Sequence, residues 1–198
     1  MKKWNNDDII FSILQSRGIT TKKDIDAFFY PKPPYELSFK DVGIDKNYTK
    51  KAVERIEKAI KDKESIVIYT DYDADGLTAG AIVWEAIHKF GGLIMPHVPH
   101  RVNEGYGLTK KGIDTVFEKY HPTLLITVDH GITARYEVEY AKSKGMDVIV
   151  TDHHLKPDIL PNCLIVHTTA LSGAGVAYFL AKELISSLDE QRTTNYEL

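Results

Sequence analysis

The chain has 198 residues, of which 43% are apolar and 27% are charged, an ordinary composition for a globular protein that buries a core. Lys and Arg total 25 against 28 for Asp and Glu, so the net charge is -3 at pH 7. This balance excludes a polybasic protein, and any nucleic-acid site must be a local patch. The single cysteine, Cys163, excludes a disulfide framework and a cysteine-based zinc site.

The sequence shows no targeting or membrane-spanning segment. Residues Met1–Phe11 contain no apolar run of the length found in signal peptides, and no run of 18 apolar residues occurs. We therefore expect a cytoplasmic protein.

The first 64 residues are predicted to form a helical lead-in. Two segments carry apolar residues at helical spacing, Asp24–Tyr30 and Asn47–Lys63. In the first segment these residues are Ile25, Phe28 and Phe29. In the second they are Val53, Ile56 and Ile60. We place the domain boundary after residue 64, with a lead-in over 1–64 and one domain over 65–198.

From Ser65 onward, short apolar runs alternate with helical stretches. The predicted strands are Ser65–Thr70, Leu93–Val98, Leu124–Val128, Asp147–Thr151 and Leu164–Val166. The predicted helices are Leu77–Phe90, Thr109–Tyr120, Ala134–Lys144 and Gly173–Ser187. This alternation predicts right-handed βαβ units and therefore an α/β fold, with a mainly parallel sheet flanked by helices.

Acidic and imidazole side chains follow three of the predicted strands directly. After the first strand these are Asp71, Asp73 and Asp75; after the third, Asp129 and His130; after the fourth, Asp152, His153 and His154. Because ligands of open α/β sheets bind outside the carboxyl ends of the strands, we expect these side chains to converge in space.

A cluster of carboxylates needs a positive counterpart, because like charges repel and burial adds a desolvation cost. Carboxylate oxygens with one or two imidazoles suit manganese or magnesium better than zinc. Two such ions can activate a water and clamp a phosphoryl oxygen, which is the arrangement used for phosphoester hydrolysis.

Simpler interpretations exist for each segment alone. Asp71–Gly76 resembles the start of a calcium-binding loop, but the glutamate that closes such a loop would fall at position 82, which is Ile82. Asp-Gly after a strand can also be a plain turn, and His153-His154 can be a solvated pair or a cap. The joint placement at three strand ends favours one common site.

The motifs at these strand ends resemble those of a known family. Asp73–Asp75, Asp129 and Asp152–His154 resemble the first three motifs of the DHH phosphoesterase superfamily. Arg101–Leu108 and Ser172–Ala177 further resemble the RecJ-type exonucleases, which are specific for single strands. The resemblance covers nearly the whole chain, with its motifs in the family's order.

The resemblance implies a role for each matching residue. The implied metal ligands are Asp71, Asp73, Asp75, Asp129 and His153. The implied catalytic residues are His154, Arg101 and Asp129, with His154 and Arg101 on the scissile phosphate. Asp152 is expected to orient the two histidines rather than to bind metal. The implied cofactors are two ions of Mn²⁺ or Mg²⁺.

The implied activity is metal-dependent hydrolysis of single-stranded DNA, from the 5′ end, in DNA repair and recombination. Two alternatives remain open. One is a related phosphodiesterase acting on short oligonucleotides, cyclic dinucleotides or polyphosphate, and the other is a non-catalytic scaffold in a replication assembly.

RecJ-type enzymes carry a further metal-binding Asp and a second domain downstream, and neither matches a segment of this sequence. We therefore expect a second polypeptide or a missing C-terminal domain to complete the site. We expect no membrane partner.

Overall fold

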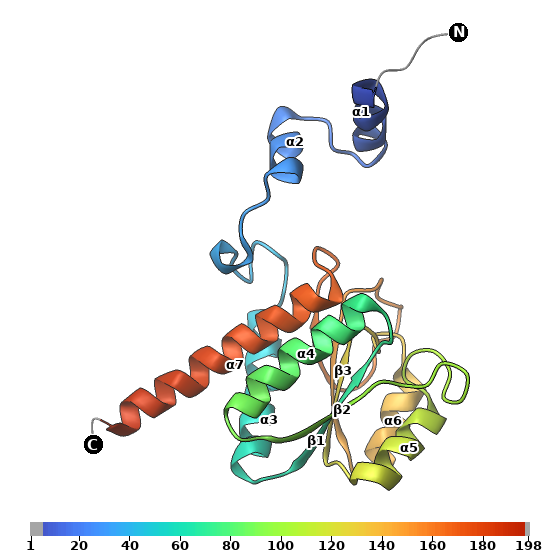
Figure 1. Cartoon of the computed structure of the whole chain (residues 1–198), viewed down its shortest axis with the longest axis vertical. Coiled ribbons are helices and arrows are strands. Elements are labelled where there is room, and N and C mark those ends of the chain that lie inside the picture. The colour runs from blue at the N-terminus through green and yellow to red at the C-terminus, as the bar shows by residue number, and fades with distance from the viewer. Residues whose placement is uncertain (1–5, 197–198) are drawn as a thin grey trace. The chain divides into compact units, whose positions relative to one another are not determined.

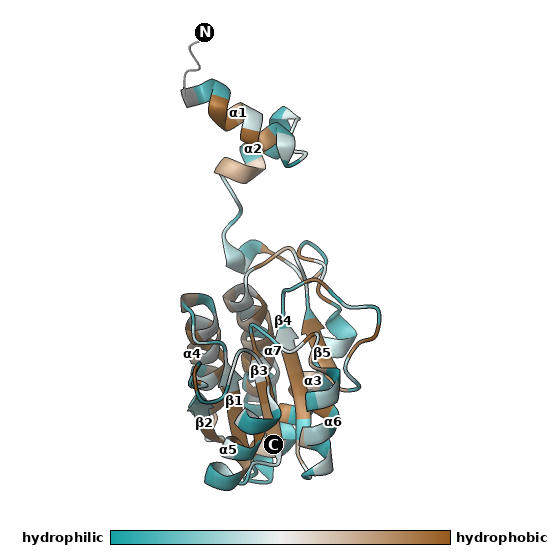
Figure 2. Cartoon of the chain, turned by 90° about the vertical axis from the view of Figure 1, so that its right-hand side faces the viewer, coloured by the Kyte–Doolittle hydropathy of each residue, from teal (hydrophilic) through white to brown (hydrophobic). Residues whose placement is uncertain are grey.

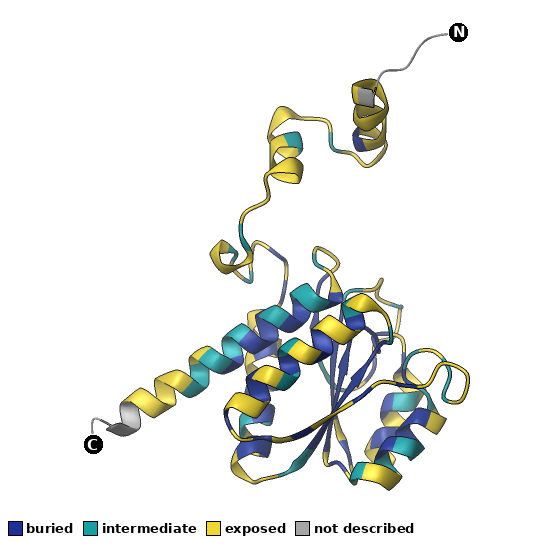
Figure 3. Cartoon of the chain, viewed as in Figure 1, coloured by how far each residue is buried: buried dark blue, intermediate teal, exposed yellow. Residues whose placement is uncertain are grey.

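The computed structural model describes residues 6–196, so the start of the Met1–Phe11 segment lies outside the described residues. Contacts divide the chain into two compact units, Met1–Ser38 and Phe39–Leu198. The first unit contains helix α1 (Asn6–Ser16), helix α2 (Lys22–Phe29) and the 3₁₀ turn η1 (Pro34–Glu36). Helix α2 corresponds to the predicted Asp24–Tyr30, but Phe28 and Phe29 on its apolar face each stay 49% exposed (Figure 3).

The second unit is a parallel α/β domain, which confirms the predicted fold class (Figure 1). Its strands are β1 (Ser65–Thr70), β2 (Leu93–His97), β3 (Leu124–Val128), β4 (Asp147–Asp152) and β5 (Leu164–His167). Its helices are α3 (Lys46–Lys61), α4 (Ala74–Lys89), α5 (Lys110–Tyr120), α6 (Arg135–Ser143) and α7 (Gly173–Tyr196). The five strands pair in the order β2-β1-β3-β4-β5, all parallel, and each ends within one residue of its predicted end.

Helices cover both faces of the sheet, and this explains why the strands are apolar nearly throughout (Figure 2). Helices α5 and α6 pack on alternate strand residues such as Val67, Leu125 and Val150, which are buried with them in one cluster. Helix α7 packs against both α3 and α4, and all three helices contact the sheet. Every residue of β3 is buried.

Two helices differ from the expectation. Helix α3 packs on β5 and α7 through its buried face, so contacts group it with the sheet although the predicted boundary follows residue 64. Helix α7 continues to Tyr196, so the predicted end at Ser187 is wrong. Its last turns are held by a 3.1 Å hydrogen bond from Gln191 to Glu57 and by Arg192, 4.6 Å from the ring of Phe90.

The strand order positions the site. In the sheet, β1 lies between β2 and β3. The chain runs from β1 to β2 in one direction and then returns past β1 to β3, so its direction across the sheet reverses. Such a reversal opens a crevice between the carboxyl ends of β1 and β3, because the connections that leave these two strands run in opposite directions across the sheet. Among the described helices, none is both long and apolar enough to cross a membrane.

Candidate metal centre

The carboxyl ends of β1, β3 and β4 bring the acidic and imidazole side chains together, as the sequence predicted. Two groups have ligand atoms within 4.8 Å of one another: Asp71, Asp73 and Asp129 form one, and Asp129, His153 and His154 form the other. Asp129 belongs to both groups. The arrangement therefore offers two adjacent cation sites with one shared carboxylate.

Asp129 is held in an unusual conformation directly after β3. Its φ of +66° is left-handed, a region that non-glycine residues visit rarely and that Asp tolerates better than most. The residue is 3% exposed, yet Oδ1 accepts no hydrogen bond among the described residues. His153 Nε2 lies 3.2 Å from this oxygen without the alignment of a hydrogen bond. A buried carboxylate oxygen without a partner is costly and fits a site that takes a cation.

The environment of Asp129 also disfavours its charge. Burial, and then the charges of Asp75 and Asp73, raise the pKa of Asp129 to about 7. Without a cation, the site thus favours the protonated form of its central carboxyl group far more than water does.

Two glycines allow the close approach that builds the cluster. A Cβ on Gly76 in α4 would lie 2.6 Å from Cβ of Asp71, and one on Gly173 would lie 2.2 Å from Oδ1 of Asp129. Both distances are shorter than any real contact, so only glycine fits at these positions. Asp73 caps α4 through Oδ1, which accepts the Gly76 N–H at 2.9 Å.

Asp75 performs a second task besides its predicted ligand role. Its two oxygens accept the N–H groups of Gly173 at 2.7 Å and Ala174 at 2.8 Å, and so cap the start of α7. Burial would raise the pKa of Asp75, but these hydrogen bonds outweigh it and lower the pKa. A carboxylate keeps free lone pairs after two such bonds. Asp75 Oδ2 is 3.9 Å from His153 Nε2, and Asp75 is in neither three-residue group, so its ligand role stays a prediction.

Asp152 orients both histidines, in agreement with the expectation. Its Oδ2 accepts the Ile132 N–H at 2.8 Å, and its Oδ1 accepts the N–H groups of His153 and His154 and the Nδ1–H of His154, the last at 2.7 Å. Burial would raise the pKa of Asp152, but these donors lower it. The hydrogen bond to Asp152 in turn raises the pKa of His154. Because Nδ1 of His154 is occupied, Nε2 is the ring atom left for a phosphate or a cation.

Arg101 lies on the exposed β2–α5 loop and belongs to neither group. Its guanidinium sits 5.1 Å from the ring centre of Tyr72, which is itself 6.1 Å from the ring of Tyr106. Burial raises the pKa of Tyr106, and the charge of Asp71 raises it further. Tyr106 therefore lies at the edge of the cluster, close enough to Asp71 for the two groups to interact. The predicted phosphate contact of Arg101 stays a prediction.

Sequence reasoning misses one polar residue of this edge, His167 at the end of β5. Its imidazole contacts the backbone of His154. The signal is present in the sequence, because His167 directly follows the predicted strand Leu164–Val166 and therefore also lies at a strand end of the same sheet.

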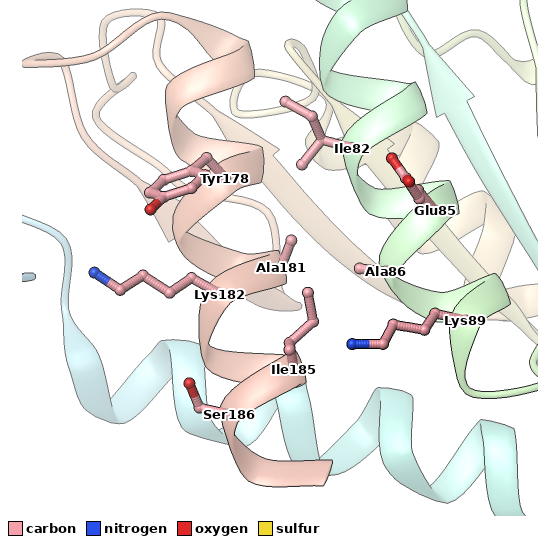
Figure 4. Close-up of a pocket in the computed structure, with 9 residues that line it drawn as sticks. All are labelled: Ile82, Glu85, Ala86, Lys89, Tyr178, Ala181, Lys182, Ile185 and Ser186. Atoms are coloured by element: carbon pink, nitrogen blue, oxygen red, sulfur yellow. The ribbon is translucent and has the colours of Figure 1, made fainter. Parts of the chain in front are cut away.

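A groove of about 500 Å³ lies elsewhere, between α7 and the C-terminal half of α4 (Figure 4). Ile82 and Ile185 line it, and Lys89 and Lys182 stand at its sides. None of the predicted site residues lines this groove.

The fold and the site together define a class: a parallel α/β domain with a carboxylate and imidazole cluster suited to hard divalent cations at its carboxyl edge. The model of the DHH family, N-terminal domain, matches residues 65–197. The chain belongs to the DHH family.

Similar proteins include single-stranded-DNA-specific exonucleases RecJ. That of Bacillus subtilis is 35% identical over 92% of this chain, and that of Escherichia coli is 35% identical over 89%. The chain spans 24% and 31% of these relatives, respectively, so it corresponds to about a quarter to a third of their length.

Solved structures of RecJ exonucleases also resemble this chain. A crystal structure of exonuclease RecJ bound to manganese matches 71% of this chain and 38% of its own, with a TM-score of 0.65 and 35% identity. RecJ of Thermus thermophilus in complex with Mn²⁺ matches 89% of this chain and 24% of its own, with a TM-score of 0.62 and 29% identity.

Proposed function

We propose that this chain is the catalytic part of a metal-dependent exonuclease that hydrolyses single-stranded DNA from the 5′ end. The observation that carries the proposal is the shared position of Asp129 between two groups of potential ligands, with one buried oxygen unpartnered among the described residues. The RecJ relatives, whose names state single-stranded DNA as substrate, support the substrate class.

The side chains present fit two divalent cations. Asp71, Asp73 and Asp129 would hold one ion, and Asp129 and His153 offer ligands for the other, with Asp75 adjacent, which leaves His154 for the phosphate. Carboxylate oxygens with imidazole nitrogens suit Mn²⁺ or Mg²⁺, and RecJ structures contain manganese. Bound cations would supply Lewis acidity to the phosphate and favour ionisation of the attacking water.

The chain's own side chains would bind and orient the substrate. His154 presents Nε2 because Asp152 holds its other ring nitrogen, and its raised pKa favours the charged form that attracts a phosphate oxygen. Arg101 adds a guanidinium on a neighbouring loop, where Tyr72 and Tyr106 offer faces on which bases can stack. Duplex DNA is too wide and stiff for a crevice bounded by these loops, and this favours single strands.

The proposal extends beyond the residues of this chain. Because the chain spans about a quarter to a third of the RecJ relatives, we propose that a further region, in the same polypeptide or in a second one, completes the metal site and the DNA channel. Adding that region should raise the activity of residues 1–198 by at least tenfold, since loss of a supporting ligand typically costs 10–100-fold. We further propose a role in DNA repair or recombination in the cytoplasm.

The test is cleavage of labelled single-stranded DNA by the purified chain with Mn²⁺, with Mg²⁺ and with chelator. Labels at the 5′ or the 3′ end establish the direction, and a blunt duplex, a dinucleotide and polyphosphate establish the substrate. Asp129→Asn is the matched control for contaminating nuclease. Equal cleavage of duplex contradicts the single-strand proposal, and preference for the dinucleotide favours the short-substrate alternative. No Mn²⁺ binding and no cleavage, even with the downstream region, would indicate a scaffold.

A further inference from the structure

We propose that His167 is a positioning residue for the site: it holds the His153-His154 segment in place from the neighbouring strand β5. The inference rests on the proposed function, because it assigns a role in supporting the two histidines that the cluster uses. His167 itself belongs to neither group of potential ligands.

The contact is a short, partly buried hydrogen bond. Nε2 of His167 lies 2.6 Å from the carbonyl oxygen of His154, and His167 is 9% exposed. A carbonyl oxygen has no proton to give, so Nε2 must carry the hydrogen and donate it. The neutral imidazole suffices for this task.

The sheet explains why a side chain is needed here. Asp152 and His167 are partners in the register of β4 and β5, and they are the last pair of that ladder. The backbone leaves the ladder after Asp152, so the carbonyl of His154 can no longer bond to a strand in the regular pattern. The imidazole of His167 reaches over this end and supplies the missing donor.

The two residues of the last pair thus hold the histidine segment from both sides. Asp152 accepts the N–H groups of His153 and His154 and fixes the ring of His154, while His167 donates to the carbonyl. The orientation of this backbone sets where His153 Nε2 lies, 3.2 Å from Asp129 Oδ1. Without the donor, the peptide after His154 can rotate, and both imidazoles lose their fixed positions relative to Asp129.

A purely structural role for His167 is the alternative, and the next residue provides the control. Thr168 is 6% exposed, and its hydroxyl donates to the carbonyl of Val42 and accepts the Ala170 N–H, rather than bonding to the His153-His154 segment. Thr168→Val therefore removes a buried hydrogen bond at the same strand end without touching the His153-His154 segment. If His167 only stabilised the fold, the two substitutions would have the same consequences.

The experiment compares His167→Leu, which removes the donor, with His167→Gln, whose amide nitrogen can take the place of Nε2. Three quantities are measured on the full chain: the unfolding midpoint, the Mn²⁺ dissociation constant by calorimetry, and the ring nitrogen signals of His153 and His154 by NMR without metal. His167→Asn, whose amide is too short to reach, replaces the Leu variant if the latter does not fold.

We expect His167→Leu to weaken Mn²⁺ binding at least tenfold and to shift the ring signals of both histidines. His167→Gln should restore binding to within about threefold, in line with the small cost of replacing one supporting donor by another. Thr168→Val should leave the Mn²⁺ dissociation constant and the histidine ring signals at wild-type values, even if its unfolding midpoint falls. Wild-type binding and wild-type ring signals in His167→Leu would overturn the inference. If the wild-type chain binds no Mn²⁺ but the ring signals respond as expected, the positioning role stands and the proposed function fails.

Discussion

The two ends of the same sheet carry two clusters of charge with opposite character. At the amino end, Glu64 precedes β1 and Asp147 begins β4, and Arg55 of α3 bonds to both, at 2.7 Å and 2.6 Å. Lys58 lies 3.3 Å from Glu64 as well. We call these four residues the amino-end cluster; its two carboxylates face two cations of the chain.

The carboxyl-end cluster (Asp71, Asp73, Asp75, Asp129, Asp152, His153 and His154) has no such balance. The ion pairs of its members within the described residues involve only histidines. The pKa values of one acidic residue from each cluster show the consequence. Burial would raise the pKa of Glu64, but hydrogen bonds from Arg55 and Thr123 lower it to about 2, whereas burial and neighbouring carboxylates raise the pKa of Asp129 to about 7.

The difference predicts that the amino-end cluster supports the fold and that the carboxyl-end cluster binds a cation. A paired set of charges is complete within the chain and contributes to stability. A buried carboxylate such as Asp129, whose Oδ1 has no hydrogen-bond partner among the described residues, opposes folding when it is charged and becomes favourable when a cation enters. The predictions below test this contrast, from the largest expected effect to the smallest.

Asp129→Asn should abolish the function of the carboxyl-end cluster. The amide keeps the shape but removes the shared negative ligand, so we expect Mn²⁺-dependent cleavage to fall at least 100-fold, above the cost of losing a supporting partner. Single-turnover assays with labelled single-stranded DNA would measure this. Cleavage within threefold of wild type would show that Asp129 is not a ligand.

Mn²⁺ should stabilise the wild-type chain but not Asp129→Asn. Linkage gives about 2.7 kcal/mol at a hundredfold excess over the dissociation constant, because only the assembled cluster binds the ion. Thermal melts with Mn²⁺ and with chelator provide the measurement. An equal shift in both proteins would place the bound ion elsewhere.

Arg55→Met should destabilise the fold by about 2 kcal/mol, because it leaves Glu64 partly buried without its main partner. Denaturant unfolding would report the loss. The same variant should keep the wild-type dissociation constant for Mn²⁺, since the two clusters lie at opposite ends of the strands. A weakened affinity would show that the clusters are coupled.

The stability of the metal-free chain should fall as pH rises from about 4 to about 7, owing to Asp129. Its folded pKa of about 7 lies above the unfolded value of about 3.9, so the folded chain holds this proton more tightly, and ionisation penalises the fold. Asn does not ionise, so Asp129→Asn should remove about 1–2 kcal/mol of this loss of stability. This value is smaller than the full pKa shift of Asp129 would give, because solvent screens part of the interaction.

Unfolding of both proteins at pH 5 and pH 8 provides the measurement. His154, whose pKa is raised mainly by its hydrogen bond to Asp152, contributes a loss of stability in the same direction in both proteins. The smaller part of its shift that comes from the charge of Asp129 enters the difference between the two proteins. Glu64 acts oppositely, with stability lost only as pH falls from about 4.3 toward 2. A difference between the proteins that does not change with pH would contradict the raised pKa.

Lys58→Met should have the smallest effect. The Lys58 side chain is 62% exposed, so solvent screens its pairs with Asp62 and with the less exposed Glu64. We expect an unfolding midpoint indistinguishable from that of wild type. A clear loss would show that the amino-end cluster depends on both cations rather than on Arg55.

The architecture and the composition of the site could be predicted from the sequence. Alternating apolar runs and helical stretches predicted five parallel strands to within one residue, because strands buried on both faces must be apolar throughout. The rule that strand ends meet at one edge placed Asp71, Asp129 and Asp152–His154 together. The family motifs added their expected roles.

The division of work among these residues became visible only in the folded chain. That Asp129 is shared between two ligand groups, that Asp75 also caps α7, and that His167 reaches the backbone of His154 all depend on contacts between separate elements. The extension of α7 to Tyr196 likewise follows from its contacts with Glu57 and Phe90. Local spacing encodes periodicity and charge, but hydrogen-bond partners and desolvation exist only once the chain has packed.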